Sequence, residues 1–93
     1  MANYSIVWTA HFTQSARRFL RRRPELDETF RETLEQLATD PSAPSLRLHA
    51  LSGKLAGKQS VSINFAYRIV LCVDVTENEV ILHDVGSHDD VYG

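Results

Sequence analysis

The residues of this 93-residue chain that could do chemistry gather near its C-terminal end. In the last segment, "ILHDVGSHDDVYG" (81–93), a strand-like run is followed by His88 and Tyr92, four residues apart. An imidazole can accept or donate a proton near neutral pH, and a phenol ring offers a face on which a flat group can stack. The spacing of four either places both side chains on one helical turn or leaves them on a frayed terminus.

The other histidines are weaker candidates. His49 precedes two glycines and, on the residues alone, is best explained as a half-exposed strand histidine, while His11 and His83 fit surface positions of a helix and a strand. No two histidines stand at i, i+4 or in an H-E-x-x-H motif, so we expect no metal site. A phosphate-binding glycine loop and a serine-hydrolase elbow are also absent from the sequence, so we expect no cofactor.

Charge is distributed unevenly along the chain, although the net charge is only −2. Residues 46–72 contain four cations and no acid, whereas residues 73–93 contain six acids and neither Lys nor Arg. The cations of the middle block are Arg47, Lys54, Lys58 and Arg68, and a second cluster, "ARRFLRRR", lies at 16–23. Either cluster could meet an anionic partner, but the whole chain lacks the strong basicity of a non-specific nucleic-acid binder.

Length and composition indicate a single domain spanning residues 1–93. Hydrophobic residues make up 43% and charged residues 24%, which is ordinary for a globular protein. Cys72 is the only cysteine, which excludes an intrachain disulfide. The first residues lack the pattern of a signal peptide and no apolar run could span a bilayer, so we expect a cytoplasmic protein without a membrane partner.

Hydrophobic periodicity predicts a strand and two helices in the first half. Residues 4–9 alternate and are rich in β-branched and aromatic types, as in a strand. Apolar residues then recur at helical spacing in two segments separated by Pro24, with Thr9 as a plausible N-cap of the first. The two stripes are Phe12, Ala16, Phe19 and Leu20, and Leu26, Phe30, Leu34 and Leu37. We therefore expect a helical hairpin.

The second half of the sequence predicts β-strands. "SVSINF" (60–65) alternates, with Val61, Ile63 and Phe65 expected to face the core. "AYRIVLCVDV" (66–75) is apolar on both faces, as in a central strand, and "VILHDVG" (80–86) follows a short polar turn. The fold class is α+β: an N-terminal strand, a helical hairpin and a three-stranded antiparallel meander in one small sheet. The hairpin covers one face, and we expect the other face to be open.

The whole arrangement resembles the RelE/ParE superfamily of toxins from bacterial toxin–antitoxin pairs, in its YafQ-like branch. The most specific matches are "H-x-L-x-G" at His49–Gly53 and "G-S-H-x-x-x-[YF]-G" at Gly86–Gly93. "YRIV" at 67–70 is shared more widely, including with members that do no RNA chemistry. The resemblance covers essentially the full chain.

The resemblance implies an endoribonuclease that cuts mRNA in the ribosomal A site without a metal. The ribose 2′-oxygen would attack the adjacent phosphate and leave a 2′,3′-cyclic product. His49 and His88 match residues that transfer protons, and Arg68 matches a phosphate-binding arginine. Tyr92 matches the aromatic residue that orients the base, and Lys54 and Lys58 lie close to the places of phosphate-binding lysines. A cognate antitoxin is also implied as a partner.

The chain departs from the family pattern at several places. A further histidine and an aspartate of YafQ-like enzymes correspond to Ser62 and Ala66, and an expected cation of the last strand corresponds to Asp84. Losing cations from a phosphate site weakens transition-state stabilisation. Two alternatives to the ribonuclease therefore stay open: a ParE-like toxin that inhibits DNA gyrase by binding, and a family member that has lost activity.

Overall fold

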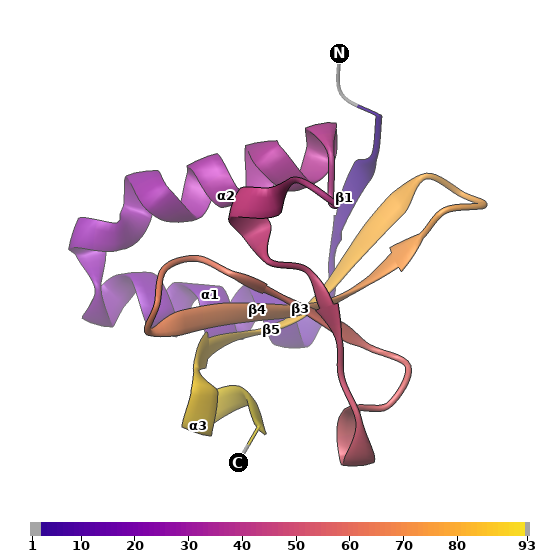
Figure 1. Cartoon of the computed structure of the whole chain (residues 1–93). Coiled ribbons are helices and arrows are strands. Elements are labelled where there is room, and N and C mark those ends of the chain that lie inside the picture. Colours follow the sequence, from indigo (N-terminus) through magenta and orange to yellow (C-terminus); the bar gives the residue numbers. More distant parts are fainter. Residues whose placement is uncertain (1–2, 93) are drawn as a thin grey trace.

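The computed structural model describes residues 3–92 and combines one sheet with helices (Figure 1). The strands are β1 (Ser5–Trp8), β2 (His49–Ala50), β3 (Gln59–Ser62), β4 (Tyr67–Asp74) and β5 (Glu79–Ser87). The α-helices are α1 (Ala10–Arg22), α2 (Asp27–Thr39) and α3 (His88–Tyr92). Short 3-10 turns lie at Pro24–Leu26, Pro44–Leu46 and Gly53–Leu55. The α+β class predicted from the sequence is confirmed.

The five strands form one sheet in the order β1-β5-β4-β3-β2. The last three strands are an antiparallel meander, as predicted, and β4 lies in the middle of the sheet. β1 pairs with β5 in parallel, so the N-terminal strand extends the edge next to the end of the chain. β2 has only two residues and forms the opposite edge.

The predicted helical hairpin is present and covers one face of the sheet (Figure 1). The Thr9 hydroxyl accepts a hydrogen bond from the Phe12 N–H and caps α1, as expected. Phe12 stacks on Phe30 of α2 with ring centroids 6.2 Å apart, which joins the two helices. Leu26, expected in the second helix, lies instead in the 3-10 turn that Pro24 starts.

One expectation about the core is wrong. Phe65 was expected to continue the inward face of its strand, but it is 95% exposed. The strand ends at Ser62, and the Asn64 side chain accepts hydrogen bonds from the N–H groups of Ala66 and Tyr67. This local turn competes with strand pairing and directs Phe65 into solvent, whereas Val61 and Ile63 do pack into the core.

A β-bulge interrupts β5. Leu71 of β4 pairs with Leu82, but the preceding residue, Val70, pairs with Asp84, so His83 is an extra residue. The bulge shifts the alternation by one residue. Leu82 and Val85 therefore both reach the core although they are three residues apart.

The face opposite the hairpin is only partly open, which corrects the expectation of a bare surface. α3 folds back and contacts β4 and β5 on that side of the sheet (Figure 1). Within residues 3–92, no helix has the length and apolar character needed to cross a membrane.

Phe12→Ala should lower the free energy of unfolding by about 3–5 kcal/mol, because the ring is fully buried between the sheet and α2. Phe65→Ala is the matched control, since it removes the same side chain from an exposed turn and should change stability by less than about 0.5 kcal/mol. Urea unfolding followed by circular dichroism measures both. Equal losses would contradict the core described above.

Candidate active site

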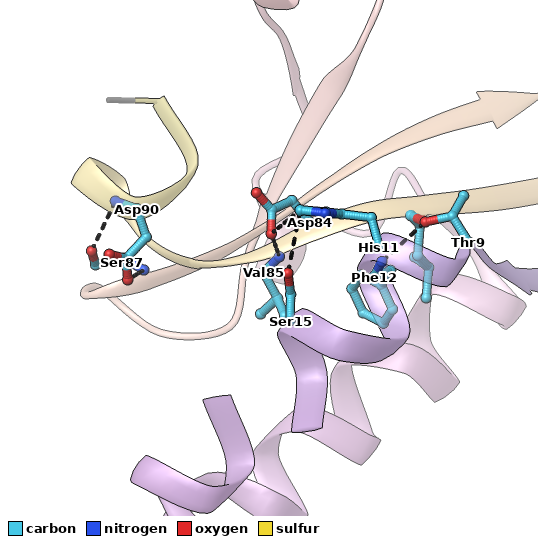
Figure 2. A network of polar contacts seen from close by, with 9 residues as sticks. Thr9, His11, Phe12, Ser15, Asp84, Val85, Ser87 and Asp90 are labelled. Carbon is cyan, nitrogen blue, oxygen red and sulfur yellow. Dashed lines mark hydrogen bonds and ion pairs between the residues drawn. The ribbon is translucent and has the colours of Figure 1, made fainter. Parts of the chain in front are cut away.

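The C-terminal helix α3 is held at its start by a reciprocal cap. The Ser87 hydroxyl accepts from the Asp90 N–H at 3.2 Å, and Asp90 Oδ2 accepts from the Ser87 N–H at 3.1 Å (Figure 2). This is a capping box in which aspartate replaces the more usual glutamate. It fixes where the helix begins, and therefore fixes His88 as its first residue.

The cap favours an ionised carboxylate. The hydrogen bond from the Ser87 backbone lowers the pKa of Asp90 below its ordinary value of 3.8, and the Ser87 hydroxyl lowers it further. Burial opposes this shift, and Arg22 and Arg18 of α1 add smaller effects that lower the pKa. Asp90 is therefore charged near neutral pH, which suits its place in the first turn of a helix.

Gly86 lets α3 pack directly on the sheet. A Cβ at this position would lie 2.8 Å from the Cβ of Asp90, closer than real Cβ contacts allow. The side of Gly86 that α3 covers is also the side of Arg68, because the two residues are partners in the β4–β5 ladder. The glycine of the G-S-H sequence is therefore required by close approach of the helix.

α3 brings His88 and Tyr92 together. Their ring centroids are 4.4 Å apart in an edge-to-face arrangement, so the two side chains share one helical turn. The Tyr92 hydroxyl donates a 2.7 Å hydrogen bond to the hydroxyl of Ser60, a fully buried residue of β3. The end of the described chain is thus tied to the sheet by a polar contact.

His49 lies on the same face of the sheet. It is the cross-strand partner of Ser60, and such partners project to the same side. Its Nδ1 lies 3.1 Å from the carbonyl oxygen of Arg47. In the tautomer that donates this hydrogen bond, Nε2 keeps its lone pair and can accept a proton.

A pocket of about 470 Å³ joins these residues. We call it the histidine pocket; it is lined by His49, Lys54 and Leu55 on one side and by His88 and Tyr92 on the other. Four of the six site residues predicted from the sequence therefore line one pocket. Two imidazoles, a phenol and an ammonium group around an accessible space suit proton transfer at an anionic substrate.

The other two predicted residues lie outside this pocket. Arg68 is on the same face of the sheet, where its Nη1 donates to the hydroxyl of Ser62 at 3.0 Å. Lys58 lines a neighbouring pocket beside His83. Sequence reasoning did not single out Ser60, Ser87 or Asp90. The S-x-x-D spacing was a usable signal for the last two, whereas nothing in the sequence marks Ser60 as the partner of Tyr92.

A larger groove of about 610 Å³ lies between α1 and β5. At one end, Nε2 of His11 is 3.4 Å from both the Ser15 hydroxyl and Asp84 Oδ1 (Figure 2). This is not a Ser-His-Asp hydrolase triad, because a triad uses both ring nitrogens and here one nitrogen makes both contacts.

Comparison with solved structures decides the fold. YafQ from E. coli superposes with a TM-score of 0.80 at 12% sequence identity, covering 97% of this chain and 99% of YafQ. A YoeB/ParE toxin from Agrobacterium tumefaciens superposes with a TM-score of 0.74 at 20% identity, covering 90% of this chain and 98% of that toxin. A chain of the toxin–antitoxin complex RelBE2 from Mycobacterium tuberculosis superposes with a TM-score of 0.62 at 16% identity. The match covers 92% of this chain and 99% of that chain.

This chain has the RelE/ParE toxin fold. At the level of sequence, no family model matches it and no curated protein is significantly similar. The fold resemblance proposed from the sequence is confirmed, including its YafQ-like neighbours.

The departures from the family pattern have defined places in the RelE/ParE fold of this chain. Ser62 holds the guanidinium of Arg68, and Ala66 belongs to the exposed turn between β3 and β4. Asp84, where a cation was expected, faces His11 next to the bulge of β5. The expected cation is thus replaced by a carboxylate that has an imidazole neighbour.

Gly86→Ala should detach α3 while leaving the rest of the fold intact. The added methyl group collides with Asp90 and breaks the cap, which costs only about 1 kcal/mol of global stability. In NMR spectra, the nuclear Overhauser contact between Tyr92 and Ser60 should disappear, and amide exchange at 87–92 should accelerate. Val75→Ala, in the exposed turn between β4 and β5, is the control. Retention of the contact in the glycine variant would contradict this role.

Acid should weaken the attachment of α3 to the sheet. Because the pKa of Asp90 is lowered in the folded state, the cap contributes fully above the ordinary carboxyl pKa, and its contribution is lost as pH falls through the lowered value. Following the Tyr92–Ser60 contact by NMR from pH 7 downward measures the loss. Asp90→Asn should remove the acid dependence, and an unchanged pH curve in this variant would contradict the assignment.

Proposed function

We propose that this protein is the toxin of a type II toxin–antitoxin pair and that it cleaves mRNA at the ribosome. The observation that supports this most directly is the histidine pocket: His49, His88, Tyr92 and Lys54 line one space on a RelE/ParE fold. The reaction would need no metal, because histidines and cations can supply its proton transfers and charge stabilisation.

In the proposed reaction, His49 is the general base. Nε2 takes the proton of the ribose 2′-hydroxyl, and the hydrogen bond from Nδ1 to the Arg47 carbonyl orients the ring. The 2′-oxygen forms a bond to phosphorus as the bond from phosphorus to the 5′-oxygen breaks. The products are a 2′,3′-cyclic phosphate and a strand that begins with a 5′-hydroxyl.

His88 is the general acid that protonates the departing 5′-oxygen. Its Nδ1 lies 3.7 Å from Asp89 Oδ1, a contact that becomes an ion pair when the imidazole carries its proton. Its place at the start of α3 orients the ring toward the histidine pocket rather than along a mobile tail. After the reaction the two histidines have exchanged protonation states, and solvent restores them.

Cations and an aromatic ring complete the proposed site. Lys54 is the cation in the pocket itself, Lys58 lines the neighbouring pocket, and Arg68 lies on the same face of the sheet. They would stabilise the charge that develops on the phosphate oxygens. Tyr92 would stack on a base of the mRNA, with its hydroxyl anchored on Ser60.

An antitoxin is the proposed protein partner. The similar structure from M. tuberculosis is a toxin–antitoxin complex, and α1 of this chain offers a cationic surface for such a partner. In the part of the chain that the structure describes, none of the five arginines at 17–23 makes an ion pair. An acidic segment of an antitoxin would neutralise them.

A second candidate function is gyrase inhibition by binding, without catalysis. It is favoured by the missing family residues at Ser62 and Ala66 and by the carboxylate of Asp84. The two candidate functions do not depend on the same residues, because a toxin that acts by binding needs no acid–base pair.

The ribonuclease is tested by induced expression of wild type, His49→Ala and His88→Ala, with sequencing of RNA ends in the arrested cells. Wild type should arrest growth and produce new ends that carry 2′,3′-cyclic phosphate in translated messages. Each alanine variant should reduce cleavage by about 10²–10⁴-fold, the usual contribution of one acid or base.

Glu35→Gln, on the exposed side of α2, is the control and should cleave as wild type does. Arrest without new RNA ends, unchanged in the histidine variants, would replace the ribonuclease by the gyrase-binding toxin. Absence of arrest in cells that contain folded protein would indicate a fold that has lost its toxicity.

A further inference from the structure

A second pocket, of about 330 Å³, lies next to the histidine pocket on the same side of the sheet. Leu55 lines both pockets, and Val91 of the second pocket immediately precedes Tyr92 of the first. A nucleic-acid strand whose scissile phosphate lies between His49 and His88 would therefore bring a neighbouring nucleotide to this second pocket.

The second pocket has apolar walls. Leu55 comes from the 3-10 turn, Val70 from β4 and Val91 from α3, so three separate elements meet around the space. Apolar walls of this kind disfavour a phosphate group, which would lose its hydration there, and favour a flat ring.

The polar groups of this pocket differ from those of a phosphate site. Burial, together with the nearby Lys58 ammonium, lowers the pKa of His83 below its ordinary value of 6.5. A neutral imidazole offers one donor and one acceptor. Lys58, His11 and Asp84 are the other ionisable groups that line the pocket, and the Asp84 carboxylate repels an anion.

Asp84 lines this pocket and keeps acceptor capacity. Its Oδ1 accepts the Val85 N–H at 2.9 Å and lies 3.4 Å from His11 Nε2, whereas no hydrogen bond within residues 3–92 uses Oδ2. A carboxylate has about four lone-pair positions on two oxygens. It can therefore accept two further hydrogen bonds from adjacent N–H groups on a ligand.

We propose that this second pocket binds a guanine base of the RNA next to the nucleotide that is cleaved, with Asp84 accepting hydrogen bonds from its N1–H and 2-amino groups. Guanine is the RNA base whose edge presents a ring N–H beside an amino group, so it pairs best with a carboxylate. Its O6 and N7 are acceptors that suit the Lys58 ammonium and the N–H of His83. This inference rests on the proposed ribonuclease for its biological setting.

Base selectivity follows from the donors and acceptors. Uracil offers one ring N–H flanked by two carbonyl oxygens. Its edge therefore places a carbonyl oxygen next to a carboxylate oxygen, and two acceptors cannot form a hydrogen bond. Adenine and cytosine each provide an amino group without the adjacent ring N–H. All four nucleotides share the same phosphate, so a comparison among them isolates the contribution of the base.

NMR titration of the full-length protein with GMP, AMP, CMP and UMP tests the pocket directly. GMP should shift the resonances of His83, Asp84 and Val91, and it should bind at least about tenfold more tightly than UMP, the effect of one good hydrogen bond to a charged group. Equal affinities, or shifts confined to the histidine pocket, would overturn the proposal.

Two variants and one control test whether the second pocket determines the preference for GMP. Asp84→Asn keeps the shape of the side chain but replaces one acceptor oxygen with a donor, so GMP should lose most of its preference while UMP binding stays the same. Val91→Trp should fill the pocket and abolish GMP binding. Glu35→Gln removes a distant exposed carboxylate and should change nothing. Unchanged GMP preference in both pocket variants would also overturn the proposal.

Nucleotide binding and RNA cleavage are measured separately, so failure of the guanine pocket can be distinguished from failure of the ribonuclease. Selective GMP binding in the second pocket by a protein that cleaves no RNA would support the pocket and remove the ribonuclease. Cleavage that depends on His88, with no preference for guanine beside the cut, would support the ribonuclease and overturn the guanine pocket.

Discussion

The candidate site depends on one local interaction, the cap between Ser87 and Asp90 above Gly86. Without it, the last residues would leave the sheet as an unpaired end, and His88 and Tyr92 would lose their common turn. A five-residue helix is far too short to be stable alone. It persists because the cap satisfies the N–H groups of Ser87 and Asp90 and because its last aromatic residue is anchored on Ser60.

The bulge in β5 connects this site to the hydrophobic core. Leu82 and Val85 both face the helical hairpin, so the strand is fixed on its covered side by two buried contacts three residues apart. The extra residue, His83, is directed toward the second pocket. A single irregularity thus allows the same strand to serve both the core and the second pocket, in keeping with the frequent placement of bulges near functional sites.

Much of the fold could be predicted from the sequence because its signals are local and periodic. The apolar stripes predicted the hairpin, and the doubly apolar run at 66–75 predicted the central strand. The position of Phe65 could not be predicted from alternation, because the Asn64 side chain ends the strand. Within the site, His88 and Tyr92 were readable from their spacing, but Ser60 was not, since only the folded chain brings it within reach of Tyr92.

The acidic segment at residues 73–93 has a structural explanation that its composition did not suggest. Asp90 caps α3 and lies in the field of two arginines of α1, and Asp84 faces His11, so two of the six acids are used in folding the site. These contacts leave the cations Lys54, Lys58 and Arg68 on the site face without an ion-pair partner among residues 3–92. The acidic segment therefore helps to build the site without forming an ion pair with these three cations, which leaves them able to contact a phosphate chain.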